Sequence, residues 1–159
     1  MRTPHLLMLM LLTACGASRQ ARRLEGRYQT GDPGPGWTRV RPGGADRAWY
    51  SDDLHATIYT DSNCATRFED RPLDKLADSA LLGMSAGEPD LSETRTIDGR
   101  EALVRRQSGV LDGVPFELGI AVLKKNECVY DFLLVSTPGG IDRAWDAFEA
   151  VLAGFQARG

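Results

Sequence analysis

The chain has 159 residues, of which 42% are hydrophobic and 26% are charged, and this is enough for one domain with a proper hydrophobic core. Its formal net charge is −3 at pH 7. Such a balance argues against a nucleic-acid-binding protein, because phosphate backbones are bound by clustered lysine and arginine. We therefore expect no nucleic-acid partner.

The N-terminal segment has the order of a secretory signal. Arg2 supplies a positive charge, and an uninterrupted apolar run follows from Leu6 to Leu12. A bilayer-spanning helix needs about 20 such residues. The run is too short for that, so we expect no retained transmembrane helix.

Leu12-Thr13-Ala14-Cys15 resembles the lipobox of bacterial lipoproteins. The resemblance implies cleavage after residue 14, a diacylglyceryl group on the Cys15 thiol and an acyl chain on the new N-terminus. Such an anchor is stable, since each buried methylene contributes about 0.8 kcal/mol. Gly16 stands where an aspartate would favour the inner membrane, which points to the outer membrane, facing the periplasm. The alternative is an ordinary signal peptide followed by an unrelated cysteine.

Residues 15–36 are predicted to form a lipidated, flexible tether between a signal of residues 1–14 and a single globular domain over residues 37–157. The tether ends in a run of turn formers from Gly31 to Gly36. Such a composition cannot bury enough surface to offset its ordering entropy. Its arginines either contact anionic lipid or remain solvated: Arg19, Arg22, Arg23 and Arg27.

The first half of the domain alternates extended segments with one helix. Residues 37–40, 49–50 and 55–60 are rich in β-branched and aromatic side chains, which predicts strands. Asp61-Ser62-Asn63 reads as a turn that ends the third of them. Residues 73–84 repeat apolar side chains at i, i+3, i+4, i+7 and i+8, the pattern of an amphipathic helix.

The second half changes to a period of two. Residues 92–97 and 100–108 are joined by an Asp-Gly pair, a strong hairpin signal. Residues 114–124 and 127–136 continue the alternation and complete an antiparallel meander. Residues 141–155 carry an aromatic-rich apolar stripe, which predicts a final helix packed on the sheet.

The order of these elements indicates an α+β fold, in which an antiparallel sheet of about five to seven strands is packed by two main helices. Three segments resemble the PsbP-like α/β/α group, which includes exported bacterial lipoproteins: Asp98-Gly99-Arg100-Glu101-Ala102, Val129-Tyr130-Asp131-Phe132, and Phe148 followed by Gly154-Phe155. The resemblance covers about residues 37–155. It implies a domain that binds proteins and assists assemblies, without shared catalytic residues.

Cysteine usage fits an exported protein. If Cys15 carries lipid, Cys64 and Cys128 remain, and two cysteines in an oxidising compartment predict one disulfide. Two free buried thiols, or a metal site completed by His55, are the alternatives. The spacing lacks the C-x-x-C or H-x-x-x-H pattern of a zinc site.

Candidate catalytic residues are few. A nucleophilic serine or cysteine needs a base beside it, and His55 is the only histidine beyond the signal. A hydrolase would require Asp52, Asp53, His55 or Asp131 to converge in a cleft with perturbed pKa values. The sequence carries no motif for a phosphate or cofactor, so we expect no catalytic residue, no cofactor and no metal.

Asp131 stands in the middle of an otherwise apolar segment. A buried carboxylate is costly unless it is paired. Either an arginine of a neighbouring strand, Arg105 or Arg106, pairs with it, or Asp131 belongs to a functional site. Four aromatic residues near the first strands either pack in the core or form a face for a partner: Trp37, Trp49, Tyr50 and Tyr59.

These observations favour a lipid-anchored, periplasm-facing envelope protein without catalytic activity, whose partners are the membrane and an envelope protein or assembly. The alternative is a carrier of a lipid or small ligand, with a cleft between the sheet and the helices. A hydrolase with a dispersed carboxylate site is the third hypothesis.

Overall fold

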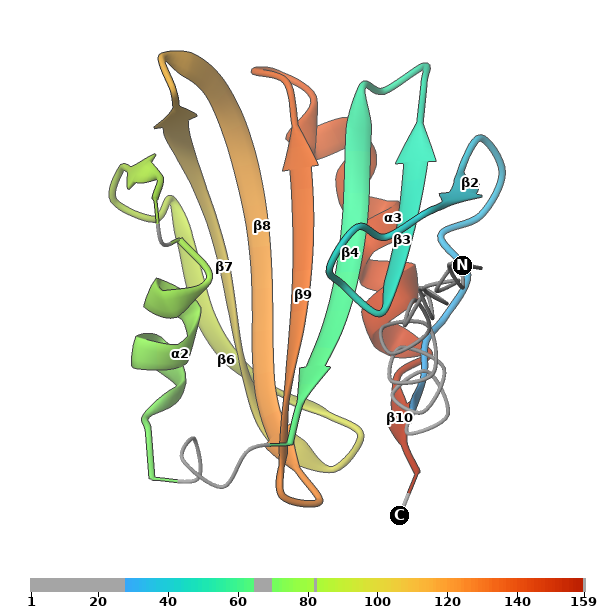
Figure 1. Cartoon of the computed structure of the whole chain (residues 1–159), viewed down its shortest axis with the longest axis vertical. Helices are drawn as coiled ribbons and strands as arrows, with labels where there is room; N and C mark the ends of the chain where they lie inside the picture. Colours follow the sequence, from blue (N-terminus) through green and yellow to red (C-terminus); the bar gives the residue numbers. More distant parts are fainter. Residues whose placement is uncertain (1–27, 65–69, 82, 159) are drawn as a thin grey trace, which may run out of the picture.

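An antiparallel sheet forms the middle layer of the molecule, with a helix on each side (Figure 1). The computed structural model describes residues 28–64, 70–81 and 83–158. Within these ranges the main sheet has eight strands in the order β2-β3-β4-β9-β8-β7-β5, and β6 pairs with another part of β7. The strands are β2 (Thr38–Val40), β3 (Arg47–Ser51), β4 (Ala56–Asn63), β5 (Ser85–Ala86), β6 (Leu91–Ile97), β7 (Arg100–Leu111), β8 (Val114–Lys125) and β9 (Cys128–Ser136).

The predicted α+β class is confirmed, with its antiparallel pairing and its two main helices, α2 (Leu73–Ser79) and α3 (Ile141–Ala153). The sheet exceeds the expected five to seven strands because of β5, whose two residues are too few for an alternating pattern to reveal. A second, two-stranded sheet pairs β1 (Tyr28–Gln29) with β10 (Gln156–Ala157).

The two faces of the sheet bury separate cores. Alternate residues of β9 point to opposite sides, so Tyr130, Phe132 and Leu134 join the core under α3. Val129 lies in the second core, with Leu76 and Ala77 of α2. Strand β9 is therefore apolar on both faces, apart from Asp131, and it lies between β4 and β8 in the middle of the sheet.

Three two-residue turns fix the register of the meander. Asp98-Gly99, Asp112-Gly113 and Asn126-Glu127 have positive φ at both positions. This is the requirement of the type I′ turn, whose twist matches that of the flanking strands. The third turn falls one residue later than Lys125-Asn126, where the sequence placed it.

Helix α2 is shorter than the predicted helix over residues 73–84. The N–H groups of Ala80 and Leu81 donate to carbonyl groups three residues earlier, at 3.1 and 3.2 Å. These tighter turns end the α-helix. Leu81 still packs against the second core, which explains why the apolar spacing extends past the last helical residue.

The prediction of a tether that extends to residue 36 is corrected, because residues 28–36 belong to the fold. The Tyr28 side chain is 1% exposed, and its hydroxyl lies 2.9 Å from Thr60 Oγ1. The Gly31 N–H donates to the carbonyl of Val151 in α3 at 3.0 Å. A Cβ added to Gly154 would overlap the backbone of Gly31. The buried Tyr28 side chain and the contact between Gly31 and Gly154 therefore fix this segment against the rest of the domain, although its composition alone suggested a loop.

The predicted disulfide is present and joins Cys64 to Cys128. It links the residue after β4 to the first residue of β9, and these two strands are neighbours in the sheet. Both thiols are consumed in this bond, so neither the free-thiol nor the metal alternative applies to them.

The signal of residues 1–14, with its lipobox-like segment, and residues 15–27 of the predicted tether lie outside the described residues. Among the helices that the structure describes, none combines the length and apolar character needed to span a bilayer.

Candidate functional site

The sheet face on the α2 side is unevenly covered. Helix α2 packs mainly against β7 and β8. The other half of this face belongs to β4 and β9, and six of its side chains are only half-buried. We call these six residues the open face: Thr57, Tyr59, Asp61, Asp131, Leu133 and Val135.

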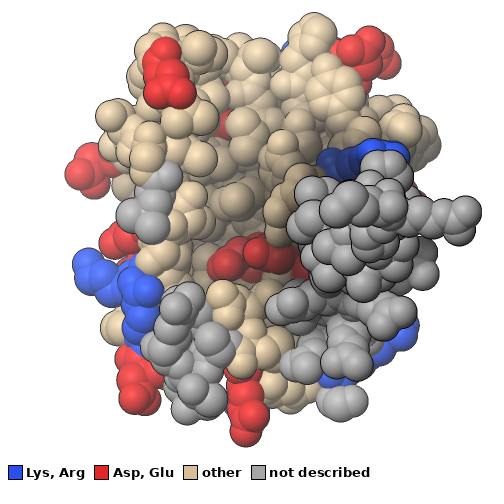
Figure 2. All heavy atoms as spheres, viewed as in Figure 1, with Lys and Arg blue, Asp and Glu red and all other residues tan. Residues whose placement is uncertain are grey.

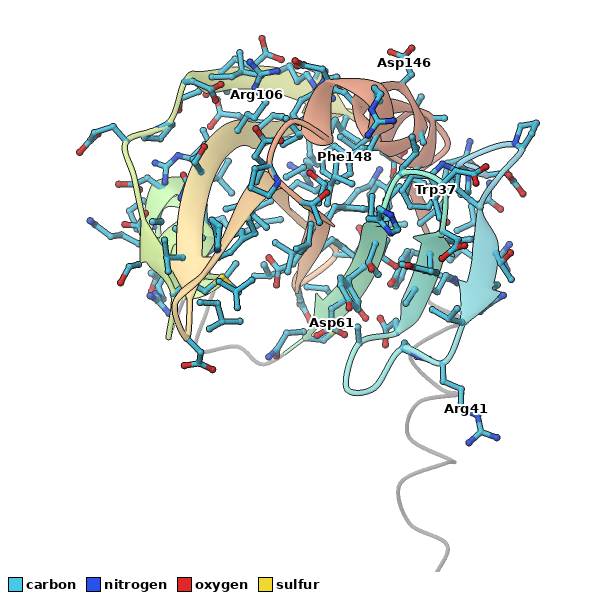
Figure 3. All side chains as sticks on the ribbon, turned by 90° about the horizontal axis from the view of Figure 1, so that it is seen from above. Trp37, Arg41, Asp61, Arg106, Asp146 and Phe148 are labelled. Carbon is cyan, nitrogen blue, oxygen red and sulfur yellow. A yellow bond between two sulfur atoms is a disulfide. The ribbon has the colours of Figure 1, made fainter. Side chains whose placement is uncertain are left out.

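Two carboxylates lie opposite each other on the open face. Asp61 of β4 and Asp131 of β9 are direct partners in the antiparallel register, and in such pairs the side chains share a face with Cβ atoms about 5 Å apart. Asp61 lies on the side of the sheet away from Phe148 of α3 (Figure 3). Figure 2 shows acidic side chains near the centre of this face, in a hollow among uncharged residues.

Both carboxyl groups titrate far above their ordinary range. Burial, reinforced by the charge of Asp61, raises the pKa of Asp131 to about 7. Burial also raises the pKa of Asp61, to about 6, together with the nearby charge of Asp46. The backbone N–H groups of Ser62 and Asp46 donate to Asp61 and partly offset this rise. Asp61 therefore ionises first, and its charge opposes ionisation of Asp131.

The expected arginine partner of Asp131 is not found. Arg105 donates to Asp78 of α2 at 2.9 Å. Arg106 pairs with Asp90 and Asp142. Arg106 faces the α3 side of the sheet, as do its β7 neighbours Ala102 and Val104, whereas Asp131 faces the other side. Neither of these two arginines therefore pairs with Asp131.

The residues named for a hydrolase do not converge. Asp52, Asp53 and His55 are exposed in the β3–β4 turn, where φ of His55 is 44°. In the β4–β9 register Ala56 lies opposite Ser136, five residues along β9 from Asp131. At 3.3 Å per residue this separates the turn from Asp131 by about 17 Å. These residues therefore form no common cleft with Asp131.

Sequence reasoning missed Asp61 as a site residue. Asp61-Ser62-Asn63 has the composition of a turn, but β4 continues through all three residues to Asn63. The alternation of buried and half-buried residues along β4 was the available signal, since it places Asp61 on the same face as Thr57 and Tyr59.

The four aromatic residues near the first strands divide between the two expectations. Trp49 is 8% exposed in the core under α3, and Trp37 packs against that core. Tyr59 lies on the open face, and Tyr50 is exposed on β3 beside Thr57. Trp37 and Trp49 therefore stabilise the core, while Tyr59 lies on the open face and Tyr50 lies beside it.

A second exposed apolar feature is the tip of the β7–β8 hairpin. Val110, Leu111 and Val114 are 42%, 42% and 64% exposed around the Asp112-Gly113 turn. Leu111 and Val114 are register partners on the same side of the sheet as the open face. Exposed aliphatic side chains gathered at one place are typical of contact surfaces.

The acidic pair is the chemically distinctive feature of the open face. Among the described residues, no three side chains of histidine, cysteine, aspartate or glutamate are placed to hold a metal ion. Two carboxylates on an apolar floor can share a proton, or can receive a cationic group whose apolar stem packs beside them.

No family model and no curated protein matches the chain. Among solved structures it is similar to LpqN, involved in cell envelope biogenesis of Mycobacterium tuberculosis, with a TM-score of 0.56, 12% identity and coverage of 83% of each chain. It is also similar to a protein of unknown function from Pseudomonas aeruginosa, with a TM-score of 0.50, 15% identity and coverage of 77% of this chain and 82% of that one.

A third similar structure is cyanobacterial PsbP (CyanoP) from Synechocystis sp. PCC 6803, with a TM-score of 0.48 and 17% identity over 92% of this chain and 98% of that one. The first two comparisons establish that this arrangement of sheet and helices occurs in other bacterial proteins.

Proposed function

We propose that this protein is a lipid-anchored, non-catalytic envelope protein, held on the outer membrane and facing the periplasm, which binds a segment of a protein partner on its open face. The open face carries the proposal. It places four uncharged side chains and two carboxylates on adjacent central strands, where sheets ordinarily bury their surface under another layer.

The size of α2 explains why this surface remains accessible. A helix of seven residues is about 10 Å long. It covers Leu103 of β7 and Leu118, Ile120 and Val122 of β8. Leu133 and Val135 of β9 lie at the margin of this core, and Tyr59 lies one strand further. A partner segment laid beside α2 would complete the layer and bury these side chains.

The envelope location rests on the lipobox-like Leu12-Thr13-Ala14-Cys15. The Cys64–Cys128 bridge agrees with an oxidising compartment. The fold shared with LpqN, a protein involved in envelope biogenesis, is consistent with the same setting.

The test is site-specific photocrosslinking in intact cells that produce the full-length chain. A photoreactive amino acid replaces Tyr59 on the open face or, as a control, exposed Asp146 of α3. We expect one envelope protein to be crosslinked at position 59 and not at position 146. Equal products at both positions, or none at position 59, would contradict partner binding on this face. Crosslinks to lipid alone would support the carrier alternative instead.

A further inference from the structure

The acidic pair forms one end of the open face, beside its apolar part. Along the two strands, Tyr59 and Leu133 are the next register partners on the same face as Asp61 and Asp131. On β8 the register partner of Asp131 is Val122, which is fully buried. A group that reaches the carboxylates from the middle of the open face therefore passes over an aromatic and aliphatic surface.

The charged groups around the pair are engaged elsewhere. Arg47 of β3 lies over the ring of Tyr28 and donates to the Tyr28 carbonyl at 2.9 Å. Lys124 of β8 donates to the carbonyl of Arg71 at 3.0 Å. Arg105 of β7 is bound to Asp78. Asp46, at the start of β3, accepts from Ser62 at 2.6 Å and adds a third negative charge.

Within the described residues, no lysine or arginine forms an ion pair with Asp61 or Asp131. The basic side chains pair instead with other carboxylates: Asp74, Asp78, Asp90, Glu93, Asp98, Asp142 and Glu149. Like charges directly opposite each other destabilise a strand pair. The backbone N–H groups of Ser62 and Asp46 offset the lost hydration of Asp61 only in part, and burial disfavours the charged form of Asp131. The open face thus holds an electrostatic cost that a ligand of the correct charge would remove.

We infer that the partner segment proposed above inserts a lysine or arginine side chain between Asp61 and Asp131, with apolar residues next to it that lie along the rest of the open face. This rests on the proposed function and specifies its partner. The methylene stem packs on Tyr59 and Leu133, and the cationic head forms charge-assisted hydrogen bonds to both carboxylates.

Other occupants fit this surface less well. An uncharged apolar segment or an acyl chain would bury both carboxylates without compensation. A calcium ion takes six to eight oxygen ligands, and the two opposed carboxylates supply too few. The charged head of a basic side chain pairs with the carboxylates, and its methylene stem packs on the neighbouring apolar side chains. Binding of such a side chain should weaken in acid, because the carboxylates become protonated.

The probe is a phage-displayed library of random heptapeptides, selected at pH 8 against the detergent-solubilised full-length chain. We expect enriched peptides that carry lysine or arginine next to apolar residues. One selected peptide and its Lys→Gln analogue are then titrated against the wild type, Asp131→Asn and the control Asp146→Asn.

For the wild type and Asp146→Asn, the Lys→Gln change should weaken binding about tenfold or more, because hydrogen bonds to charged groups are worth about 1.5–3 kcal/mol. For Asp131→Asn the same change should have a much smaller effect. Binding of the lysine peptide to the wild type should also weaken at pH 5.5. Thermal melting of each variant confirms that it is folded.

Selected peptides without a basic preference would overturn the inference. So would an equal effect of Lys→Gln on the wild type and on Asp131→Asn. In either case, a partner still crosslinked at position 59 would leave the proposed function standing. Loss of that crosslink as well would remove both.

Discussion

At the scale of single residues, the opposed Asp61 and Asp131 are the feature with the largest consequence. Their register places two like charges face to face at the centre of the sheet, where neighbouring positions are aliphatic or aromatic. Such an arrangement lowers the stability of the folded domain. Positions where a residue type conflicts with its surroundings in this way are the ones expected to serve binding or catalysis.

The pair should make stability increase as the solution becomes more acidic. The folded-state pKa values of about 6 for Asp61 and about 7 for Asp131 lie above the ordinary aspartate value, so the native state binds protons that the unfolded state does not. Their contribution is complete below about pH 4 and is lost as pH rises through 6 and 7. Between pH 8 and pH 5 the free energy of unfolding should rise by up to about 4 kcal/mol, of which Asp131 contributes the larger part.

Urea unfolding at pH 5 and pH 8 measures this effect, and Asp131→Asn isolates its cause. The variant should be more stable than the wild type at pH 8 and should lose most of the pH dependence. The exposed Asp146→Asn is the matched control and should behave as the wild type does. A pH dependence that persists unchanged in Asp131→Asn would contradict the assignment.

At the scale of elements, the junction of β4 and β9 joins two parts of the chain that are distant in sequence. Strand β4 lies near the start of the domain and β9 near its end, and their pairing connects the β2-β3-β4 half of the sheet with the β9-β8-β7 half. The Cys64–Cys128 bridge, with a sequence separation of 64, lies at one end of this junction. It closes a long loop where the sheet depends on a non-local pairing.

Reduction of this bridge should lower the melting temperature. The chain-entropy model assigns a closed loop of this length roughly 4 kcal/mol of stabilisation through the unfolded state. The melting temperature is measured with and without a reductant that leaves other groups unchanged. The double variant Cys64→Ser, Cys128→Ser should have the same melting temperature as the reduced protein. Identical melting temperatures, together with two titratable thiols before reduction, would exclude the bridge.

At the scale of the whole molecule, the correction at the N-terminus shortens the distance to the proposed anchor. Tyr28 already belongs to the fold, so at most residues 16–27 separate the fold from Cys15. A segment of this length spans at most about 40 Å when fully extended. The domain is therefore expected to work within that distance of the membrane, where its partner must also present its binding segment.

The anchor itself is tested by Cys15→Ala. Without the thiol no lipid can be attached, so we expect the protein to move from the membrane fraction to the soluble fraction after cell lysis. Immunoblots of both fractions give the measurement, and the protein with Cys64→Ser and Cys128→Ser serves as the control, since it keeps Cys15. Continued sedimentation of Cys15→Ala in high salt would contradict lipid anchoring.

The sequence by itself determined the features that depend on local periodicity and turn chemistry. Alternation over residues 114–124 and 127–136 predicted β8 and β9 with the correct faces, because the two-residue period of a strand is visible in one segment. The Asp98-Gly99 hairpin and helix α3 followed in the same way. The disulfide came from counting cysteines once Cys15 was assigned to lipid.

Only the tertiary structure decided features that join distant segments. The pairing of β1 with β10 and the buried position of the Tyr28 side chain both require the two ends of the domain to lie side by side. The register that sets Asp61 against Asp131 depends on which strand lies beside β9. The neighbour of β9 is decided by packing and loop closure across the whole chain rather than by any local pattern. For this reason the sequence suggested an arginine as the partner of Asp131, whereas the structure places Asp61 opposite it.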